Sequence, residues 1–395
     1  MLLPAIGRAW LHHKVGDQHL FNECMRELKN KKAPGPDGVT NEVLKALPPS
    51  GRRALHGLMQ LMWATACTPD LLKPTQTVLA HKKESLLELG NYRRLGLENT
   101  LLNLWTKLIA KAMADHAEKS GMLSCTQAGF RAKRGTEYQL EMLTMALEDA
   151  RLTQQDIYLL MIDFSEAFDT TNHDKLLQVL YDLGFATDAI EVVKNLYTCI
   201  TTRVQTPFGE TGPIPIERGT IQGDSLSPFL FILYFEPLLR WLRHGGRGCK
   251  PGCMPGTKAT GYTLPACTYA DDLNVLSSSA HDTTVQAAKI SKYADWADMR
   301  VNMKKSTVTG AMYRTHPEKP YDQEMLSRRL RPVEIAGETV RFVPTTSPFR
   351  FLGLQMTVDL NWSHQAASMR RKLKDQAAAV LKSPLASWRK EQVLR

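Results

Sequence analysis

Hydrophobic residues along the chain follow two spacings, and each predicts a different kind of element. Over residues 55–62 and 101–113, apolar positions recur every three to four residues, which is the spacing of helices that bury one face. Residues 157–162, by contrast, form a short unbroken apolar run that stops abruptly at Asp163. Such a run is typical of a buried strand. We therefore predict a buried strand with an acidic residue at its carboxyl end.

Start and stop signals predict a helix and a hairpin after that strand. Asn172 can cap a helix whose leucines share one face, and Gly184 follows them as a stop signal. These leucines are Leu176, Leu177, Leu180 and Leu183. Further along, residues 204–208 and 214–217 flank a turn that contains Gly-Glu-Thr-Gly, and this arrangement predicts a β-hairpin.

The next stretch predicts a helix, an exposed loop and a basic tail. Ser227-Pro228 has the order of an N-cap followed by a first-turn proline, and Pro237 should kink or end the helix that begins there. Residues 245–261 are rich in Gly and Pro and predict a loop. Residues 369–395 hold eight basic residues against two acidic ones, so we expect a basic helix there.

Length and charge narrow the class of protein. A chain of 395 residues exceeds a usual domain of about 100–200 residues, so about two or three subdomains are expected. Fifty Lys and Arg against forty Asp and Glu give a net charge of +10, which favours a polyanionic partner, either nucleic acid or an anionic membrane surface. The longest apolar stretch, 229–235, is far shorter than the roughly 18 residues of a membrane span. Seven cysteines fit a reducing compartment, and the first residues show no clear signal-peptide cleavage site. These features argue against a secreted or membrane protein.

Two separate acidic segments are the strongest candidates for chemistry. Asp271 and Asp272 adjoin between two short apolar runs, as at the tip of a hairpin, and Asp163 ends the predicted buried strand. A solvated turn is the alternative for the adjacent pair, because Asp favours turns. Two-metal phosphoryl transfer requires carboxylates that bridge ions about 3.5–4 Å apart, and Mg²⁺ prefers oxygen ligands. Remote segments that each supply a carboxylate favour the metal interpretation over the turn.

A second, weaker metal hypothesis concerns cysteine. Cys249 and Cys253 lie near His244 and Cys267, but the spacing is loose and lacks a second tight pair. Unlinked loop cysteines are therefore the preferred interpretation, with zinc as the alternative.

Longer motifs resemble those of a known family. Residues 162–173 (Ile-Asp-Phe-Ser-Glu-Ala-Phe-Asp-Thr-Thr-Asn-His), 219–228 (Gly-Thr-Ile-Gln-Gly-Asp-Ser-Leu-Ser-Pro) and 269–272 (Tyr-Ala-Asp-Asp) resemble the palm motifs of reverse transcriptases. The Ala-Phe-Asp…Asn-His form is similar to that of non-LTR, LINE-like retrotransposons. Supporting matches follow in the family's order at residues 32–39, 91–93, 127–131, 302–305 and 351–354. Each motif alone is weak, but their ordered succession is specific.

The resemblance implies a catalytic metal site. Asp163, Asp271 and Asp272 match the family's catalytic triad, with the first two as the main ligands of two Mg²⁺ ions, for which Mn²⁺ can substitute. Asp272 is implied to be a weaker or outer ligand. The backbone carbonyl of Phe164 is implied to complete the shell of one ion.

It also implies residues around the incoming nucleotide. Lys305 matches the general acid that protonates the departing pyrophosphate, with adjacent Lys304 as the alternative. Phe168 matches the aromatic steric gate that clashes with a ribose 2′-hydroxyl. Gln222 and Gly223 match the element against the nascent base pair, where glycine permits close backbone approach.

Basic residues before the predicted strand are implied to hold phosphates. Arg93, together with Lys82 or Lys83, resembles the fingers residues that clamp the triphosphate, and an Arg fork suits bidentate phosphate binding. Arg131 and Arg134 are implied to hold the template backbone without reading its sequence.

The implied fold is an α+β right-hand polymerase with fingers, a palm built on an antiparallel sheet, and a partial helical thumb. The expected boundaries place an N-terminal extension at 1–28, fingers at 29–155, the palm at 156–356 and a truncated start of the thumb at 357–395. The reverse transcriptase core, with fingers elements, is expected to span about 63–356.

The implied function is RNA-directed DNA polymerisation from deoxynucleoside triphosphates on an RNA template with a DNA or RNA primer. A group II intron-type maturase, a decayed non-catalytic nucleic-acid-binding remnant and an RNA-copying RNA polymerase are the alternatives. The resemblance further implies an intracellular, nuclear location, no membrane partner, and a larger polyprotein with endonuclease and thumb regions that we do not find in this sequence.

Overall fold

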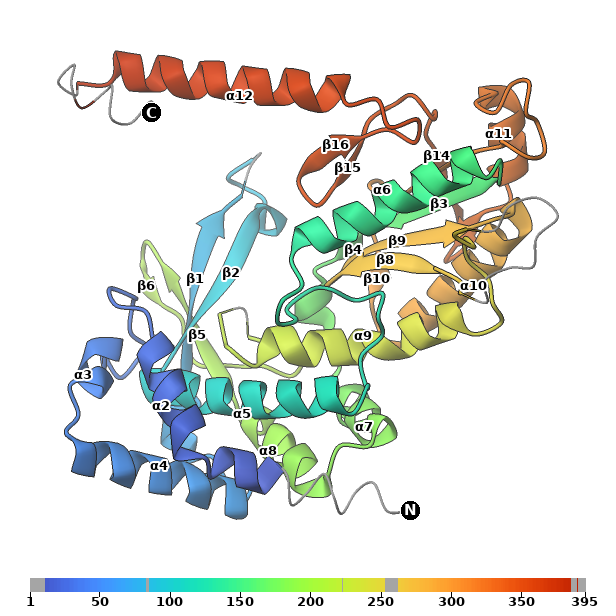
Figure 1. Cartoon of the computed structure of the whole chain (residues 1–395). Helices are drawn as coiled ribbons and strands as arrows, with labels where there is room; N and C mark the ends of the chain where they lie inside the picture. Colours follow the sequence, from blue (N-terminus) through green and yellow to red (C-terminus); the bar gives the residue numbers. More distant parts are fainter. Residues whose placement is uncertain (1–10, 83–84, 222, 253–261, 385–388, 390–395) are drawn as a thin grey trace. The chain divides into compact units, whose positions relative to one another are not determined.

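The computed structural model describes residues 11–82, 85–221, 223–252, 262–384 and 389. The chain has a mixed α/β fold with several small sheets (Figure 1). It divides into two compact units, each assembled from three segments of the chain. The first unit comprises 1–135, 163–244 and 289–302, and the second comprises 136–162, 245–288 and 303–395.

The first unit is rich in helices. Those that lie within it are α2 (Gln18–Glu27), α3 (Asn41–Lys45), α4 (Pro49–Ala64), α5 (Thr100–Lys119), α7 (His173–Leu183), α8 (Thr187–Tyr197) and α9 (Ser227–Arg243). Short 3₁₀ turns occur at η1 (Asp70–Leu72), η2 (Leu89–Asn91) and η3 (Ala167–Thr170). Helices α4 and α5 confirm the elements predicted from the spacing over 55–62 and 101–113.

One sheet of the first unit has the strand order β2-β1-β5-β6, with β7 also paired to β5. Its strands are β1 (Thr75–His81), β2 (Tyr92–Glu98), β5 (Thr201–Thr206), β6 (Gly209–Glu210) and β7 (Ile214–Pro215). The β1–β2 pair is antiparallel, whereas β1 and β5 run parallel. The predicted hairpin is present, but the chain folds back earlier than expected, since Thr206 already pairs with Gly209.

Helix α7 forms as its end signals predict. The Asn172 side chain accepts a hydrogen bond from the Lys175 amide at 3.1 Å, which satisfies a free donor of the first turn. Gly184 ends the helix at a φ of +90°, a left-handed conformation that glycine adopts without a Cβ clash.

Helix α9 differs from its prediction in two ways. Its first amide, that of Ser227, is bound by the Asp224 carboxylate at 3.0 Å, so Asp224 supplies the capping side chain. The helix also continues past Pro237 to Arg243, so Pro237 does not end it, and a kink there stays a prediction. Twelve of the 17 residues of α9 are buried, so tertiary packing offsets the hydrogen bond that proline cannot make.

The second unit is built on a sheet with the order β14-β11-β3-β9-β8. Its strands are β3 (Ile157–Ile162), β8 (Ala266–Tyr269), β9 (Asp272–Ser277), β11 (Thr307–Ala311) and β14 (Arg341–Phe342). All pairings are antiparallel except that of β11 with β14. Every residue of β3 is buried, which confirms the predicted buried strand.

A hydrophobic core packs α6 (Thr136–Leu152) against one face of this sheet, and Figure 1 shows the helix lying across it. Leu143 and Leu147 of α6 share this core with Leu159 of β3 and Phe351. The smaller elements of the unit are α11 (Gln323–Leu330), β12 (Glu334–Ile335), β13 (Glu338–Thr339), β15 (Phe349–Phe351) and β16 (Leu354–Met356). Helix α10 (Ala280–Trp296) spans the sequence division between the units.

Helix α12 (Ser363–Lys382) includes the first part of the basic segment 369–395, which was predicted to be helical. No residue of this helix is buried, and Met369 and Leu373 are largely exposed. Residues 385–388 and 390–395 lie outside the described residues. Among the described residues, no helix combines the length and the apolar composition that a membrane crossing requires.

Candidate active site

The adjacent carboxylates lie at the tip of a tight hairpin, as predicted. Strands β8 and β9 are antiparallel, and Tyr269 pairs with Asp272, so only Ala270 and Asp271 form the turn. Ala270 has a φ of +56°, which two-residue turns between twisted strands require. Asp271 is half-buried and Asp272 is exposed. The turn thus presents two neighbouring carboxylates toward solvent at the end of a buried hairpin.

The strand register brings the end of β3 beside the start of β9. Ile162, the last residue of β3, pairs with Leu273, the residue after Asp272. Asp163 is the next residue of the chain after Ile162 and belongs to the first unit. There its backbone carbonyl accepts a hydrogen bond from the Asn302 amide at 2.8 Å.

A short antiparallel pair continues from that point. Strand β4 (Phe164–Ser165) pairs with β10 (Arg300–Val301), and the ring of Phe164 meets that of Phe235 edge-on at 5.4 Å. Within the described part of the chain, no three or more His, Cys, Asp or Glu side chains are grouped to hold a metal ion. The metal-ligand roles of Asp163, Phe164, Asp271 and Asp272 therefore stay predictions.

Phe168 is held among other aromatic rings. It lies in the turn η3, and its ring stacks on Phe231 of α9 with centroids 4.3 Å apart. Phe130 meets the same ring edge-on at 6.0 Å. Phe231 is completely buried, whereas Phe130 is about half exposed. The ring predicted to act as a steric gate thus has a fixed backing, although its role stays a prediction.

Two glycines of the 219–228 motif allow close backbone packing. A Cβ on Gly219 would lie 2.8 Å from the Cα of Asp169, and one on Gly223 would lie 2.5 Å from the carbonyl oxygen of Gly96. Both glycines have positive φ. The close approach expected at Gly223 is therefore an approach to strand β2, and any contact with a nucleotide stays a prediction. Gln222 lies outside the described residues.

The predicted phosphate-binding cations lie on the β1–β2 hairpin. Arg93 pairs in register with Ala80, and Lys82 follows β1, where its amide donates to the Asn91 carbonyl at 2.8 Å. Both side chains are exposed. Lys83 lies outside the described residues. In the second unit, Lys304 and Lys305 are both exposed in the turn before β11, so either can be the predicted general acid.

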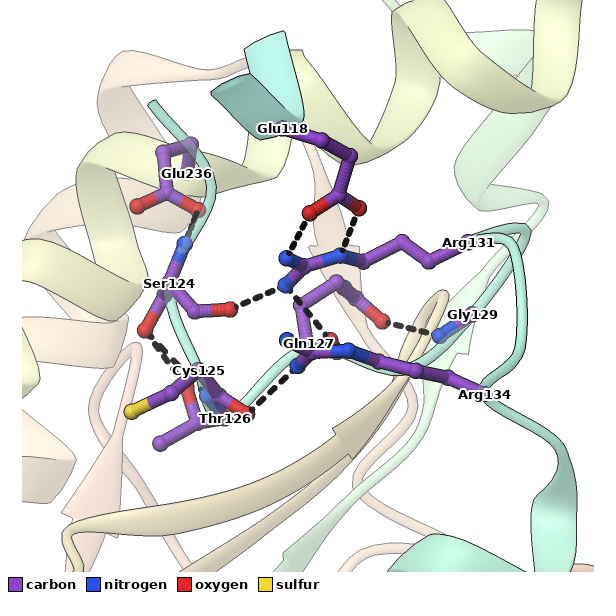
Figure 2. A network of polar contacts seen from close by, with 9 residues as sticks. All are labelled: Glu118, Ser124, Cys125, Thr126, Gln127, Gly129, Arg131, Arg134 and Glu236. Atoms are coloured by element: carbon purple, nitrogen blue, oxygen red, sulfur yellow. Dashed lines mark hydrogen bonds and ion pairs between the residues drawn. The ribbon is translucent and has the colours of Figure 1, made fainter. Parts of the chain in front are cut away.

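Arg131 requires a correction. Only 4% of its side chain is exposed, so it is not available to a template phosphate. Figure 2 shows its guanidinium between Glu118 and the 124–127 loop. Nε and Nη2 donate to the two carboxylate oxygens of Glu118 at 2.6 and 2.7 Å, and Nη1 donates to the carbonyls of Ser124 and Gln127. This pairing holds the pKa of Glu118 below its usual range. Arg131 therefore shapes the loop.

The same network contains a buried acid that the sequence motifs did not single out. Glu236 of α9 is 1% exposed and accepts a hydrogen bond from the Ser124 amide at 2.9 Å (Figure 2). Arg240 also binds this carboxylate and donates to the Met122 carbonyl at 2.7 Å. Burial raises the pKa of Glu236. The available signal was an acid directly after the apolar run 229–235, because a carboxylate in so apolar a helix requires buried partners.

We expect Arg131→Met to lower the stability of the protein by about 2–4 kcal/mol, because it strips a part-buried carboxylate and two carbonyls of their donor. Urea unfolding measures this change. Lys133→Met, at an exposed cation of the same loop, is the matched control and should cost less than about 1 kcal/mol. A different result would restore the template role of Arg131. In that case Arg131→Met would leave stability unchanged, and the salt dependence of RNA binding would fall by about one phosphate contact.

Asp224 of the 219–228 motif and Glu98 of strand β2 form a pair of buried acids. Glu98 at the end of β2 is 7% exposed, and neither of its carboxylate oxygens has a hydrogen-bond partner among the described residues. Burial, with a smaller contribution from Asp224, raises the pKa of Glu98 well above its usual value. Burial likewise raises the pKa of Asp224. The folded protein therefore binds protons at these sites more tightly than the unfolded chain does.

This pair predicts that stability falls as pH rises above the unfolded carboxyl range, about 4.3, until the folded pKa is passed. Glu98→Met removes the orphaned carboxyl at similar length and should raise stability by about 1–3 kcal/mol at pH 8, with a smaller gain at pH 5. Glu98→Gln is the control that removes only the charge. Thermal unfolding at both pH values measures the effect, and a loss of stability in Glu98→Met at pH 8 would contradict it.

Residues 80–356 match the family described as reverse transcriptase (RNA-dependent DNA polymerase). Because this match covers more than half of the chain, the protein belongs to the reverse transcriptase family. The resemblance drawn from the motifs to the non-LTR retrotransposon enzymes is confirmed at this level.

The relatives include Pol polyproteins of R2 retrotransposable elements and a probable polymerase from a transposon. The chain is 24% identical over 282 residues to a Pol polyprotein from the type-1 retrotransposable element R2 of Bradysia coprophila, covering 70% of this chain and 30% of the relative. The corresponding R2 polyprotein of Popillia japonica is 26% identical over 72% of this chain and 38% of its own length. A probable RNA-directed DNA polymerase from transposon BS of Drosophila melanogaster is 28% identical over 65% of this chain and 27% of that protein. The chain thus spans about a third of the length of these relatives.

Proposed function

We propose that this chain is the RNA-directed DNA polymerase portion of a non-LTR retrotransposon protein. The observation that carries the proposal is the β3–β9 ladder, whose pairing of Ile162 with Leu273 brings the strand end that precedes Asp163 beside the Asp271-Asp272 turn. Membership of the reverse transcriptase family supports it. Relatives named as RNA-directed DNA polymerases supply the activity that we extend to this chain.

In this proposal the subdomains of a right-hand polymerase follow the boundaries expected from the sequence. The β3–β9–β8 sheet serves as the palm, the β1–β2 hairpin as part of the fingers, and α12 as the first helix of the thumb. The predominantly antiparallel pairing of the second-unit sheet supports the palm assignment. A basic α12 without a buried residue supports a role against a nucleic-acid backbone.

The donor chemistry of the three carboxylates fits divalent ions. Mg²⁺ prefers oxygen ligands, keeps several waters and needs only one or two carboxylates, and a solvent-facing turn leaves room for those waters. Asp163 and Asp271 would be the main ligands, with Asp272 and the Phe164 carbonyl as further donors. Bound there, two Mg²⁺ ions, or Mn²⁺ in their place, would activate the primer 3′-hydroxyl and neutralise the triphosphate.

Other residues of the chain would bind and orient the nucleotide. Exposed Lys82 and Arg93 on the fingers hairpin would hold the triphosphate oxygens. Both side chains are positively charged, and the planar guanidinium of Arg can bind two phosphate oxygens at once. Phe168, backed by Phe231, would exclude a 2′-hydroxyl from the sugar site. Lys305, or Lys304 beside it, would deliver a proton to the departing pyrophosphate.

The proposed substrates are an RNA template, a DNA or RNA primer and deoxynucleoside triphosphates. A net charge of +10 supports a nucleic-acid partner. We extend the retroelement context of the relatives to a nuclear location and to membership of a larger polyprotein, since the chain matches only about a third of each relative.

Substrate choice tests the proposal. Extension of an oligo(dT) primer should proceed on poly(rA) with dTTP and Mg²⁺ or Mn²⁺, and should stop when EDTA removes the metal. Extension by UTP in preference to dTTP would instead support an RNA polymerase. Tight duplex binding without extension under any metal would support a binding protein that lacks catalysis.

A further inference from the structure

Arg94 forms contacts that the motif comparison did not assign. It follows Arg93 on β2, and its Nη2 lies 3.1 Å from Oε1 of Glu166 and 2.9 Å from Oδ2 of Asp169. A single guanidinium nitrogen thus bridges two carboxylates from the segment after Asp163. Asp169 is only 20% exposed at its side chain, so this pair is partly shielded from solvent. All three residues belong to the first unit.

Glu166 and Asp169 bracket the turn that carries Phe168. The Glu166 carbonyl accepts hydrogen bonds from the amides of Asp169 and Thr170 at 2.9 and 3.2 Å, and Glu166 has a φ of +50°. A left-handed conformation at a residue other than glycine is strained and persists only when the surroundings hold it. The two carboxylates also lie close enough to share one cation, so they repel each other when that cation is removed.

The opposite side of the turn is already fixed by the backbone. The Thr220 amide donates to the Phe168 carbonyl at 2.9 Å, and the Gly219 amide donates to the Thr171 carbonyl at 2.8 Å. Gly219 packs so closely against Asp169 that a Cβ there would lie 2.8 Å from its Cα. Arg94 therefore completes the support from the β2 side.

We propose that Arg94 is a positioning residue: by clamping Glu166 and Asp169, it fixes the turn that places the Phe168 ring, and so sets sugar selectivity. This inference rests on the proposed polymerase function. A nucleotide site must hold its groups to a fraction of an ångström, and a turn under strain and charge repulsion does not do so unaided. The ring's stacking on Phe231 limits its tilt, while the clamp limits the shift of its backbone.

The test is a double-mutant cycle. Arg94→Ala should reduce the preference for dTTP over UTP by about tenfold on poly(rA)–oligo(dT), mainly because UTP is incorporated faster. Arg94→Lys should retain part of the preference because it keeps the charge. In the Glu166→Gln, Asp169→Asn background, which removes both partners, Arg94→Ala should have no further effect on selectivity. Arg53→Ala, at an exposed cation of α4, controls for the lost positive charge and should leave selectivity unchanged.

A different result would overturn the clamp. If Arg94→Ala raises the KM for dTTP by the same factor in both backgrounds and leaves the sugar preference unchanged, Arg94 binds the triphosphate directly instead. Hydrogen exchange provides a readout that needs no activity: amides of residues 165–171 should exchange faster in Arg94→Ala than in the wild type. An inactive wild type with that faster exchange would refute the polymerase proposal and leave the clamp standing, whereas unchanged exchange would refute the clamp itself.

Discussion

Replacement of Asp163 by Asn is expected to reduce primer extension by at least about a thousandfold, equivalent to about 4 kcal/mol of transition-state stabilisation. The substitution keeps the size of the side chain and removes its charge. The backbone carbonyl of residue 163 accepts from the Asn302 amide whatever the side chain, so the β4–β10 pairing should persist. A neutral amide is a poorer ligand for a hard divalent cation, and catalysis should suffer far more than folding.

Steady-state extension on poly(rA)–oligo(dT), with circular dichroism to confirm folding, measures this effect. Asp182→Asn is the matched control, because it makes the same chemical change on the exposed face of α7 and should retain activity within about twofold. Duplex binding by Asp163→Asn should stay near the wild-type level. Activity within tenfold of the wild type would remove Asp163 from the proposed metal site.

Phe168→Val is expected to raise the incorporation of UTP relative to dTTP by about a hundredfold. The shorter side chain opens the space that the ring occupies above Phe231, and a 2′-hydroxyl can then enter without a clash. Loss of the stacked ring should also cost about 2–3 kcal/mol of stability, because valine fills only part of the space beside Phe231 and a cavity remains.

Competition between the two nucleotides on one template gives the selectivity directly. Phe168→Tyr retains the ring and should retain the wild-type preference, so it separates bulk from other effects of substitution. An unchanged preference in Phe168→Val, with the variant folded and active, would show that selectivity arises elsewhere.

Elements with strong local signals could be predicted from the sequence. Strand β3 is an unbroken apolar run, α7 carries its own cap and stop residues, and the turn at 270–271 separates two short apolar strands. In each case the residues that decide the conformation lie within a few positions of one another, so a local pattern is sufficient.

Features that depend on distant residues could not be predicted in the same way. Arg131 matched a template-binding motif, but Glu118 and the loop carbonyls bury its guanidinium. Helix α9 continues past Pro237 because its surroundings bury twelve of its 17 residues. The ion pairs of Arg94 join strand β2 to a turn about 70 residues later, and no local pattern encodes such a contact. The β5–β6 hairpin turns earlier than predicted because the Gly-rich stretch offers more than one position for a turn.

The candidate site combines both kinds of information. Its carboxylates were identified from residue type and position in the motifs, and the pairing of β3 with β9 supplies the register that relates two of the segments. The aromatic backing of Phe168 and the support of its turn come only from the structure. The sequence therefore predicts a chemistry for the candidate site, whereas the residues that support Phe168 are found only in the structure.

The most direct test of the proposed function compares the wild type with an Asp271→Ala, Asp272→Ala variant in primer extension on poly(rA)–oligo(dT) with Mg²⁺ or Mn²⁺. Both proteins should bind the duplex, measured by fluorescence anisotropy, because these carboxylates do not hold nucleic acid by charge. We predict dTTP incorporation by the wild type and none above background by the variant. Equal extension by both proteins would contradict the assignment of these carboxylates to catalysis.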